Sequence, residues 1–252
     1  MNQKNQNDIM NERLSTGIKG LDSKMQGGFL RGSVNLITGK TGTGKTALCM
    51  SFLYNGAKAG EPGVYVTTEE REEDVKNDIK AMFGWDLEAL ERKNLLKFIS
   101  IKPKLPTRII SQDKLAQLIK LYMFGISDKV QKAVREIKAK RAVVDSVSII
   151  EMFIKDEYFA KAALMQFVET LRSLNVTSVL TGTVPETSEA LSGKGIIEYI
   201  VDSIIKLNFI PVTEEFKRTL LVRKMRRTDH STLVHPFEIT KNGLKIIDVK
   251  KI

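Results

Sequence analysis

Cysteine, histidine and long apolar runs are scarce in this sequence. Its 252 residues include one cysteine, Cys49, and two histidines. A single cysteine excludes an intramolecular disulfide framework and is typical of a reducing compartment. So few histidines and cysteines argue against a His/Cys metal site. No apolar run is long enough to cross a bilayer, and the polar start "MNQKNQNDIMNE" has no apolar signal core. We therefore expect a cytoplasmic protein that does not enter the membrane.

Positive charge is what the sequence has in excess. The formal net charge is +10, and residues 206–252 hold 11 Lys and Arg against 5 Asp and Glu. An excess of this size favours an anionic partner, which could be nucleic acid, a nucleotide or a membrane surface.

The order of the expected elements predicts an α/β fold. Residues 1–12 indicate a disordered polar tail, and one domain is expected over 13–252. Apolar strands alternate with helical segments from 33 to 183, and only strands are expected from 203 to 248. We predict a mostly parallel central sheet flanked by helices, with antiparallel strands added near the C-terminus. Two helices are expected at 113–124 and 127–139, separated by Gly125.

Residues 39–46, "GKTGTGKT", match the phosphate-loop pattern G-x-x-x-x-G-K-[ST] between an expected strand and an expected helix. The glycines let the backbone curl around phosphate oxygens, and the helix N-terminus adds partial positive charge. Lys45 is expected to reach the β- and γ-phosphates, and the Thr46 hydroxyl is expected to bind Mg²⁺. The predicted ATP-binding residues are Gly39, Thr41, Gly42, Thr43, Gly44, Lys45, Thr46 and Ala47.

Acidic residues follow two of the expected strands. Asp145 comes after the apolar "AVV", at the carboxyl edge where open α/β sheets place ligands, and would hold Mg²⁺ through water. Glu69 and Glu70 end the strand "GVYVTT". We predict Glu69 as the base that positions the attacking water, with Glu70 in support. Cys49, in the helix after the phosphate loop, is interpreted as a small buried residue.

With these motifs, the sequence resembles the RecA-like ATPases, within them the KaiC-like and archaeal RadA-paralogue group. The matching segments run in family order over nearly the whole chain: "LSTGIKGLD" and "GGFLRG" within 14–32, "GKTGTGKT", "GVYVTTEE", "FGWDL" (83–87), "VVDSVS" (143–148) and "KMRRTDH" (224–230). The resemblance implies a RecA-like P-loop NTPase core that binds ATP at subunit interfaces of a homo-oligomer, either a hexamer or a filament.

The resemblance also assigns residues that contact the nucleotide of a neighbouring subunit. Lys224 and Arg226 match the pair that reaches the γ-phosphate, and Thr228 and His230 match further contacts. Strand alternation places Lys224 and Arg226 on one face, with Arg223 and Arg227 on the other, where they could serve DNA or solvent. A plain basic edge strand is the competing interpretation.

Some features depart from the family pattern. Thr183 occupies the place of a Gln or Glu that senses the γ-phosphate in the family, and this shorter side chain argues against efficient coupling of hydrolysis to movement. We expect one RecA-like core, where the circadian-clock KaiC has two, and no counterpart of the DNA-binding domain of full RadA recombinases in this sequence. "FAKA" (159–162) matches a recombinase polymerisation motif, but we interpret it as core packing. The loops at 150–158 and 184–197 correspond to DNA-facing loops. Phe153 and Tyr158 in the first could stack on bases, although a structural role is the preferred interpretation.

Three functions remain open at this point. The leading hypothesis is an ATPase that binds single-stranded DNA and modulates homologous recombination or repair, with a RadA-type recombinase as a partner. The second is a KaiC-like regulatory ATPase that controls a protein partner without nucleic acid. The third is a nucleotide-binding accessory subunit with almost no turnover, which the threonine at position 183 keeps open.

Overall fold

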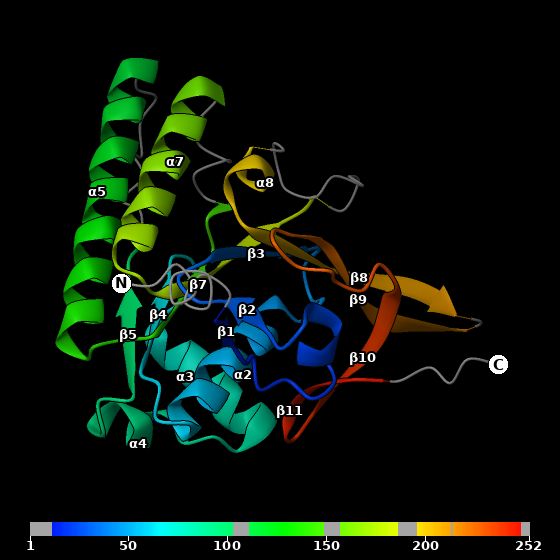
Figure 1. Cartoon of the computed structure of the whole chain (residues 1–252). Coiled ribbons are helices and arrows are strands. Elements are labelled where there is room, and N and C mark those ends of the chain that lie inside the picture. Colours follow the sequence, from blue (N-terminus) through cyan, green and yellow to red (C-terminus); the bar gives the residue numbers. More distant parts are fainter. Residues whose placement is uncertain (1–11, 103–110, 149–156, 186–195, 213, 248–252) are drawn as a thin grey trace, which may run out of the picture.

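The computed structural model describes residues 12–102, 111–148, 157–185, 196–212 and 214–247. A nine-stranded sheet forms the centre, in the order β11-β10-β9-β8-β3-β7-β6-β4-β5 (Figure 1). Its strands are β3 (Val34–Gly39), β4 (Gly63–Thr67), β5 (Leu96–Ser100), β6 (Arg141–Asp145), β7 (Thr177–Thr183), β8 (Ser203–Val212), β9 (Glu215–Met225), β10 (Val234–Thr240) and β11 (Gly243–Ile246).

The direction of the strands confirms the predicted fold class. The six strands from β8 through β3 to β5 pair in parallel, and β9, β10 and β11 add to the β8 edge in antiparallel pairs. Chain reversal between β8 and β9 makes β9 run opposite to β3. The carboxyl end of β9 therefore lies at the amino edge of the parallel strands.

Helices cover both faces of this sheet (Figure 1). One face carries α2 (Lys45–Lys58), α3 (Glu72–Phe83), α4 (Leu87–Arg92) and the short 3₁₀ helix η1 (Asp22–Met25). The other face carries α5 (Gln112–Glu136), α7 (Glu157–Ser173) and α8 (Ile197–Ile200). Alternation along the strands supplies both apolar cores: in β4, Tyr65 faces α2, whereas Val64 and Val66 face α5 and α7. A small hairpin of β1 (Arg13–Leu14) and β2 (Phe29–Leu30) precedes the sheet.

The predicted helix break at Gly125 is wrong, because α5 is one helix of 25 residues. Buried Met123 and Ile126 flank the glycine and continue the apolar face from Ile119 to Val130. A glycine inside a helix costs about 1 kcal/mol, and burial of this apolar face outweighs that cost. The short helix α4 and the β1–β2 hairpin were not expected from the sequence.

The interpretation of "FAKA" as core packing is also wrong. Phe159 is 54% exposed, and Ala162 is exposed as well. Helix α7 turns Ala160, Leu164 and Phe167 toward the sheet, and the helical period therefore leaves positions 159 and 162 on the outer face.

Some sequence predictions fall outside the described residues. The polar tail predicted at 1–12 is described only at Glu12, which pairs with Arg31. Within the described ranges, no helix is long and apolar enough to cross a membrane.

Candidate functional site

The phosphate loop connects the central strand β3 to helix α2. Between Gly39 and Lys45 the chain turns through left-handed backbone at Gly42 (φ +78°) and Gly44 (φ +105°). A Cβ atom at Gly42 would meet nothing within 4 Å, so the glycine is required there by conformation and not by space. A loop with this backbone can wrap around an anion at the start of a helix.

The predicted phosphate ligands lie where the pattern places them. Lys45 Nζ donates to the carbonyl oxygens of Gly39 and Lys40, each at 2.9 Å, so the ammonium group lies against the loop. The Thr43 hydroxyl donates to Lys40 O at 2.8 Å and tightens the same turn. Thr41 is exposed at the tip of the loop. Ala47 is buried in α2, so only its backbone could contact phosphate.

The proposed metal side of the site is formed by Thr46 and Asp145. The Thr46 hydroxyl donates to Asp145 Oδ2 at 2.8 Å, which brings the phosphate loop and the end of β6 together. Hydroxyl and carboxylate oxygens are ligands that Mg²⁺ prefers, and phosphate-bound Mg²⁺ usually takes only one or two carboxylates from the protein. The residues present therefore fit Mg²⁺.

Two further hydroxyl groups, which the sequence analysis missed, also bind Asp145. Tyr65 on β4 donates to Oδ2 at 2.8 Å, and Thr181 on β7 donates to Oδ1 at 2.6 Å. Burial, followed by the nearby Asp145 charge, raises the pKa of Tyr65 well above its ordinary value, so this hydroxyl keeps its proton.

Glu69 lies beside Asp145 at the carboxyl edge of the sheet. Its Oε1 accepts a hydrogen bond of 2.5 Å from the Ser146 hydroxyl. The backbone amide of Thr68 donates to Asp145 O at 2.9 Å, so the ends of β4 and β6 are held together. Partial burial, and then the charge of Asp145, raises the pKa of Glu70. The two predicted acids are thus at the site, with Glu69 tied directly to the residue after Asp145.

Thr183 is next to the phosphate loop. It pairs with Gly39 in the β3–β7 register, and its amide donates to the Ser148 hydroxyl at 2.7 Å. Thr183 therefore lies beside the phosphate loop with a short side chain, and its role as a γ-phosphate sensor stays a prediction. Cys49 is fully buried in α2, and burial raises the pKa of its thiol well above the ordinary value. This agrees with its interpretation as a small buried residue.

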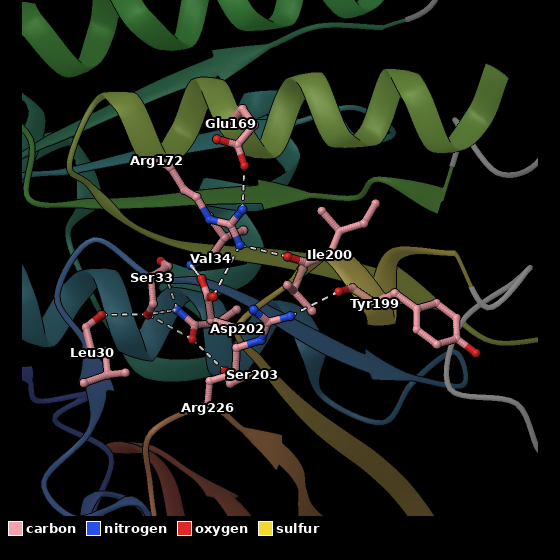
Figure 2. A network of polar contacts seen from close by, with 12 residues as sticks. Leu30, Ser33, Val34, Glu169, Arg172, Tyr199, Ile200, Asp202, Ser203 and Arg226 are labelled. Carbon is pink, nitrogen blue, oxygen red and sulfur yellow. Dashed lines mark hydrogen bonds and ion pairs between the residues drawn. The ribbon is translucent and has the colours of Figure 1, made fainter. Parts of the chain in front are cut away.

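Lys224 and Arg226 both reach helix α8. Lys224 Nζ donates to Glu198 O and Val201 O, each at 2.8 Å, and Arg226 Nη2 donates to Tyr199 O at 3.4 Å (Figure 2 shows the Arg226 contact). Burial, followed by the charge of Arg226, lowers the pKa of Lys224. These contacts place both cations on the same side, as the alternation predicted.

Asp202, just after α8, anchors this region to the core. Its Oδ2 accepts from Val34 N at 2.9 Å, and its Oδ1 pairs with Arg172 of α7 at 3.3 Å (Figure 2). Its carbonyl accepts from Arg226 N at 3.0 Å. Arg172 also donates to Ile200 O at 2.8 Å. The backbone of Arg226 is therefore fixed to the start of β3 and to α7.

The turn after β9 is held by Arg13. One guanidinium nitrogen of Arg13 donates to the Thr228 hydroxyl at 2.8 Å, and the other donates to Arg227 O at 3.1 Å. Thr228 in turn donates to Arg226 O at 3.1 Å. His230 Nδ1 lies 3.1 Å from Ser231 O. Thr228 therefore helps Arg13 to hold the turn that follows β9.

The basic segment is far from the phosphate loop of the same chain. Lys224 is level with Ile204, which pairs with Leu36, three residues before Gly39. At about 3.3 Å per residue, Lys224 lies about 10 Å back along the strands, and Arg226 lies further back. The predicted site residues thus form two groups, one at the carboxyl edge of the parallel strands and one toward the amino edge.

The loops that correspond to DNA-facing segments are largely outside the described residues. This applies to 150–156, including Phe153, and to 186–195. Of the remainder, Tyr158 is 76% exposed and Val184 is 3% exposed. The Tyr158 ring meets Phe159 edge to face, with centroids 5.9 Å apart, and the role predicted for Tyr158 stays a prediction.

A family model described as "ATPase: KaiC" matches residues 14–251. The chain belongs to this KaiC ATPase family. It is similar to UPF0273 proteins of Pyrococcus horikoshii, with 36% identity over 93% of this chain and 94% of the relative, and of Thermotoga maritima, with 36% identity over 94% and 96%. A solved structure of a KaiC-like protein from P. horikoshii aligns with a TM-score of 0.78 and 35% identity, covering 94% of this chain and 100% of the other.

Relatives of known description include the circadian clock oscillator protein KaiC of Parathermosynechococcus lividus. It is 34% identical over 92% of this chain, but the match spans only 41% of the clock protein. The resemblance to KaiC-like ATPases is thereby confirmed. The RadA-paralogue relationship stays a prediction.

Proposed function

We propose that this KaiC-family ATPase binds and hydrolyses ATP with Mg²⁺ at the interface between subunits of a homo-oligomer. The observation that supports this best is the separation of the two residue groups along the sheet. The phosphate loop lies at one edge, whereas Lys224 and Arg226 lie about 10 Å or more back along the strands from it. A neighbouring subunit supplies a nucleotide that these cations can reach.

Each residue then has a distinct part in phosphoryl transfer. Lys45 binds the β- and γ-phosphates, and Thr46 with Asp145 holds the metal, which neutralises phosphate charge when bound. Glu69, fixed by Ser146, orients the attacking water. Arg226 of the adjacent subunit stabilises the charge of the transferring phosphoryl group, as an arginine finger does.

Mixing two inactive variants tests the shared site. Lys45→Ala removes nucleotide binding but keeps the finger, whereas Arg226→Ala keeps nucleotide binding and loses at least about 100-fold in turnover. A one-to-one mixture of the two should recover about a quarter of wild-type turnover, because random assembly joins an intact loop to an intact finger at that frequency.

Arg223→Ala is the matched control, because Arg223 is an exposed arginine near the end of β9, three residues before Arg226. It should leave turnover within about twofold, the range of a surface contact. Unchanged turnover in Arg226→Ala, or a mixture that stays inactive, would refute an active site shared between subunits. Loss of ATP binding in Arg226→Ala would argue for a structural role of this arginine.

The use to which turnover is put has two candidates. The KaiC family favours control of a protein partner, since clock proteins are among the relatives. The net charge of +10 favours binding to single-stranded DNA and a role in recombination or repair, with a RadA-type recombinase as partner. Turnover measured with and without single-stranded DNA separates them. Binding to DNA should weaken linearly in log–log plots against salt, and no shift of labelled DNA at low salt would exclude the second candidate.

The accessory-subunit hypothesis is tested on the same protein. Wild-type turnover that disappears in Glu69→Gln, with ATP binding retained, would exclude it. The mass of the assembly with and without nucleotide distinguishes a hexamer from a filament.

A further inference from the structure

Asp145 receives three hydroxyl hydrogen bonds, more than metal binding requires. Thr46 and Tyr65 both donate to Oδ2, at 2.8 Å each, and Thr181 donates to Oδ1 at 2.6 Å. Thr46 belongs to the phosphate loop and has a known reason to be there. Tyr65 and Thr181 come from the sheet, and they belong neither to the phosphate loop nor to the basic segment 224–230.

The sheet register places these two hydroxyl groups on either side of Asp145. On β7, Leu180 pairs with Val144, so the next residue, Thr181, stands beside Asp145. On β4, the residue opposite Asp145 is Thr67, but its hydroxyl donates to Glu70 O at 3.0 Å. Tyr65, two residues earlier on the same face, has a side chain long enough to reach the carboxylate. Its ring is fixed by burial and by contact with Phe98, with centroids 5.2 Å apart.

The three hydrogen bonds leave few free acceptor positions on the Asp145 carboxylate. A carboxylate has about four lone-pair positions, two on each oxygen. Thr46 and Tyr65 fill both positions of Oδ2, and Thr181 fills one of Oδ1. One position on Oδ1 remains, and the carboxylate cannot rotate without breaking several hydrogen bonds at once. An acid held in this way presents a single, fixed acceptor to a metal-bound water.

We propose that Tyr65 is a positioning residue for the metal: its buried hydroxyl, with Thr181, fixes the Asp145 carboxylate in the orientation that binds Mg²⁺ through water. This inference rests on the proposed ATP·Mg²⁺ site and adds a residue to it. Partners that orient a metal ligand typically change metal affinity by about 10–100-fold when they are removed. Tyr65→Phe removes only one oxygen atom and adds no volume, so the fold and the phosphate loop remain.

The experiment measures metal binding directly, without turnover. Mn²⁺ is titrated into protein with a non-hydrolysable ATP analogue, and free Mn²⁺ is followed by electron paramagnetic resonance. We expect the Mn²⁺ dissociation constant of Tyr65→Phe to rise at least about tenfold, and that of Thr181→Val to rise as well. Binding of the analogue in EDTA should be unchanged, because Lys45 and the loop are intact, and this also verifies that each variant is folded.

Tyr122→Phe is the matched control, since Tyr122 donates its hydroxyl to Ile101 O at 2.9 Å, outside the Asp145 cluster. Its Mn²⁺ constant should equal that of the wild type. A Tyr65→Phe constant within twofold of the wild type would overturn the inference while leaving the proposed function intact. A wild-type protein that binds no Mn²⁺ with the analogue would overturn both. Equal weakening in Tyr65→Phe and Tyr122→Phe would also overturn it, because the effect would then be a general loss of structure.

Discussion

Asp202→Asn should lower the stability of the fold and displace Lys224 and Arg226, the proposed finger cations. The Asp202 side chain is 16% exposed, and its two oxygens serve Val34 N at 2.9 Å and Arg172 at 3.3 Å. An asparagine has one acceptor oxygen, so one of these two hydrogen bonds is lost, and the charge opposite Arg172 is removed, although Arg172 keeps its contacts with Ile200 O and Glu169. A hydrogen bond to a charged group contributes about 1.5–3 kcal/mol. Because Asp202 keeps some solvent contact, we expect a loss of about 2 kcal/mol in the free energy of unfolding.

Glu169→Gln is the matched control for this prediction. Glu169 pairs with the same Arg172 at 2.6 Å, but its side chain is 66% exposed. Exposed pairs contribute about 0–1 kcal/mol, so this variant should be nearly as stable as the wild type. Urea unfolding followed by the fluorescence of Trp85, the single tryptophan, measures both.

Turnover adds a functional measurement to the same pair of variants. Arg226 N donates to Asp202 O, and Lys224 Nζ donates to Val201 O, so a shift of the backbone at Val201 and Asp202 should displace both cations. We therefore expect Asp202→Asn, and not Glu169→Gln, to lower turnover while ATP binding through Lys45 is kept. If the two variants lose equal stability, or if turnover is the same in both, the anchoring role of Asp202 is refuted.

Two further predictions concern helix glycines and pH. Gly125→Ala should stabilise the protein by about 0.5–1 kcal/mol, because the added Cβ meets nothing within 4 Å. Gly56→Ala should destabilise it by about 1–3 kcal/mol, since the added Cβ would lie 2.2 Å from Arg141 Nε. Thermal unfolding of the two variants measures the difference. Glu70→Gln should be more stable than the wild type at neutral pH. The folded-state pKa of Glu70 is raised above its ordinary 4.5, so the wild-type protein loses stability as the pH rises from 4.5 through the folded-state pKa. Below pH 4.5 the carboxyl group is protonated in both states, and the advantage of the variant should vanish.

Local patterns predicted the parts of this protein that depend on neighbouring residues in the chain. The phosphate loop needs only a glycine-rich turn between a strand and a helix, and residues 39–46 carry all of it. The alternation in β9 likewise predicted that Lys224 and Arg226 share a side, which their contacts with α8 confirm. Burial of Cys49 follows from its place on a helix packed under the sheet.

What the sequence did not predict depends on register between distant strands. Tyr65 and Thr181 are 80 and 36 residues away from Asp145, and no local pattern marks a tyrosine or threonine hydroxyl as the partner of that acid. The helix break predicted at Gly125 was wrong because the glycine was given more weight than the apolar period on both sides of it. Core packing was wrongly predicted for Phe159 because the helical period was not followed through α7, where Ala160 and Leu164 face the sheet and Phe159 does not.

The reversal between β8 and β9 explains why one subunit would be incomplete on its own. In the parallel part of the sheet every strand ends at the same edge, so Gly39, Glu69 and Asp145 come together without further help. An antiparallel strand added to that sheet must deliver its last residues to the other edge, and β9 does so with the cations. If those cations serve ATP, the contact joins one edge of a subunit to a different surface of the next. Such a contact is heterologous and repeats until it closes into a ring or continues as a filament. The proposed shared site and the expected hexamer or filament are therefore one prediction, and the mixing of Lys45→Ala with Arg226→Ala tests both.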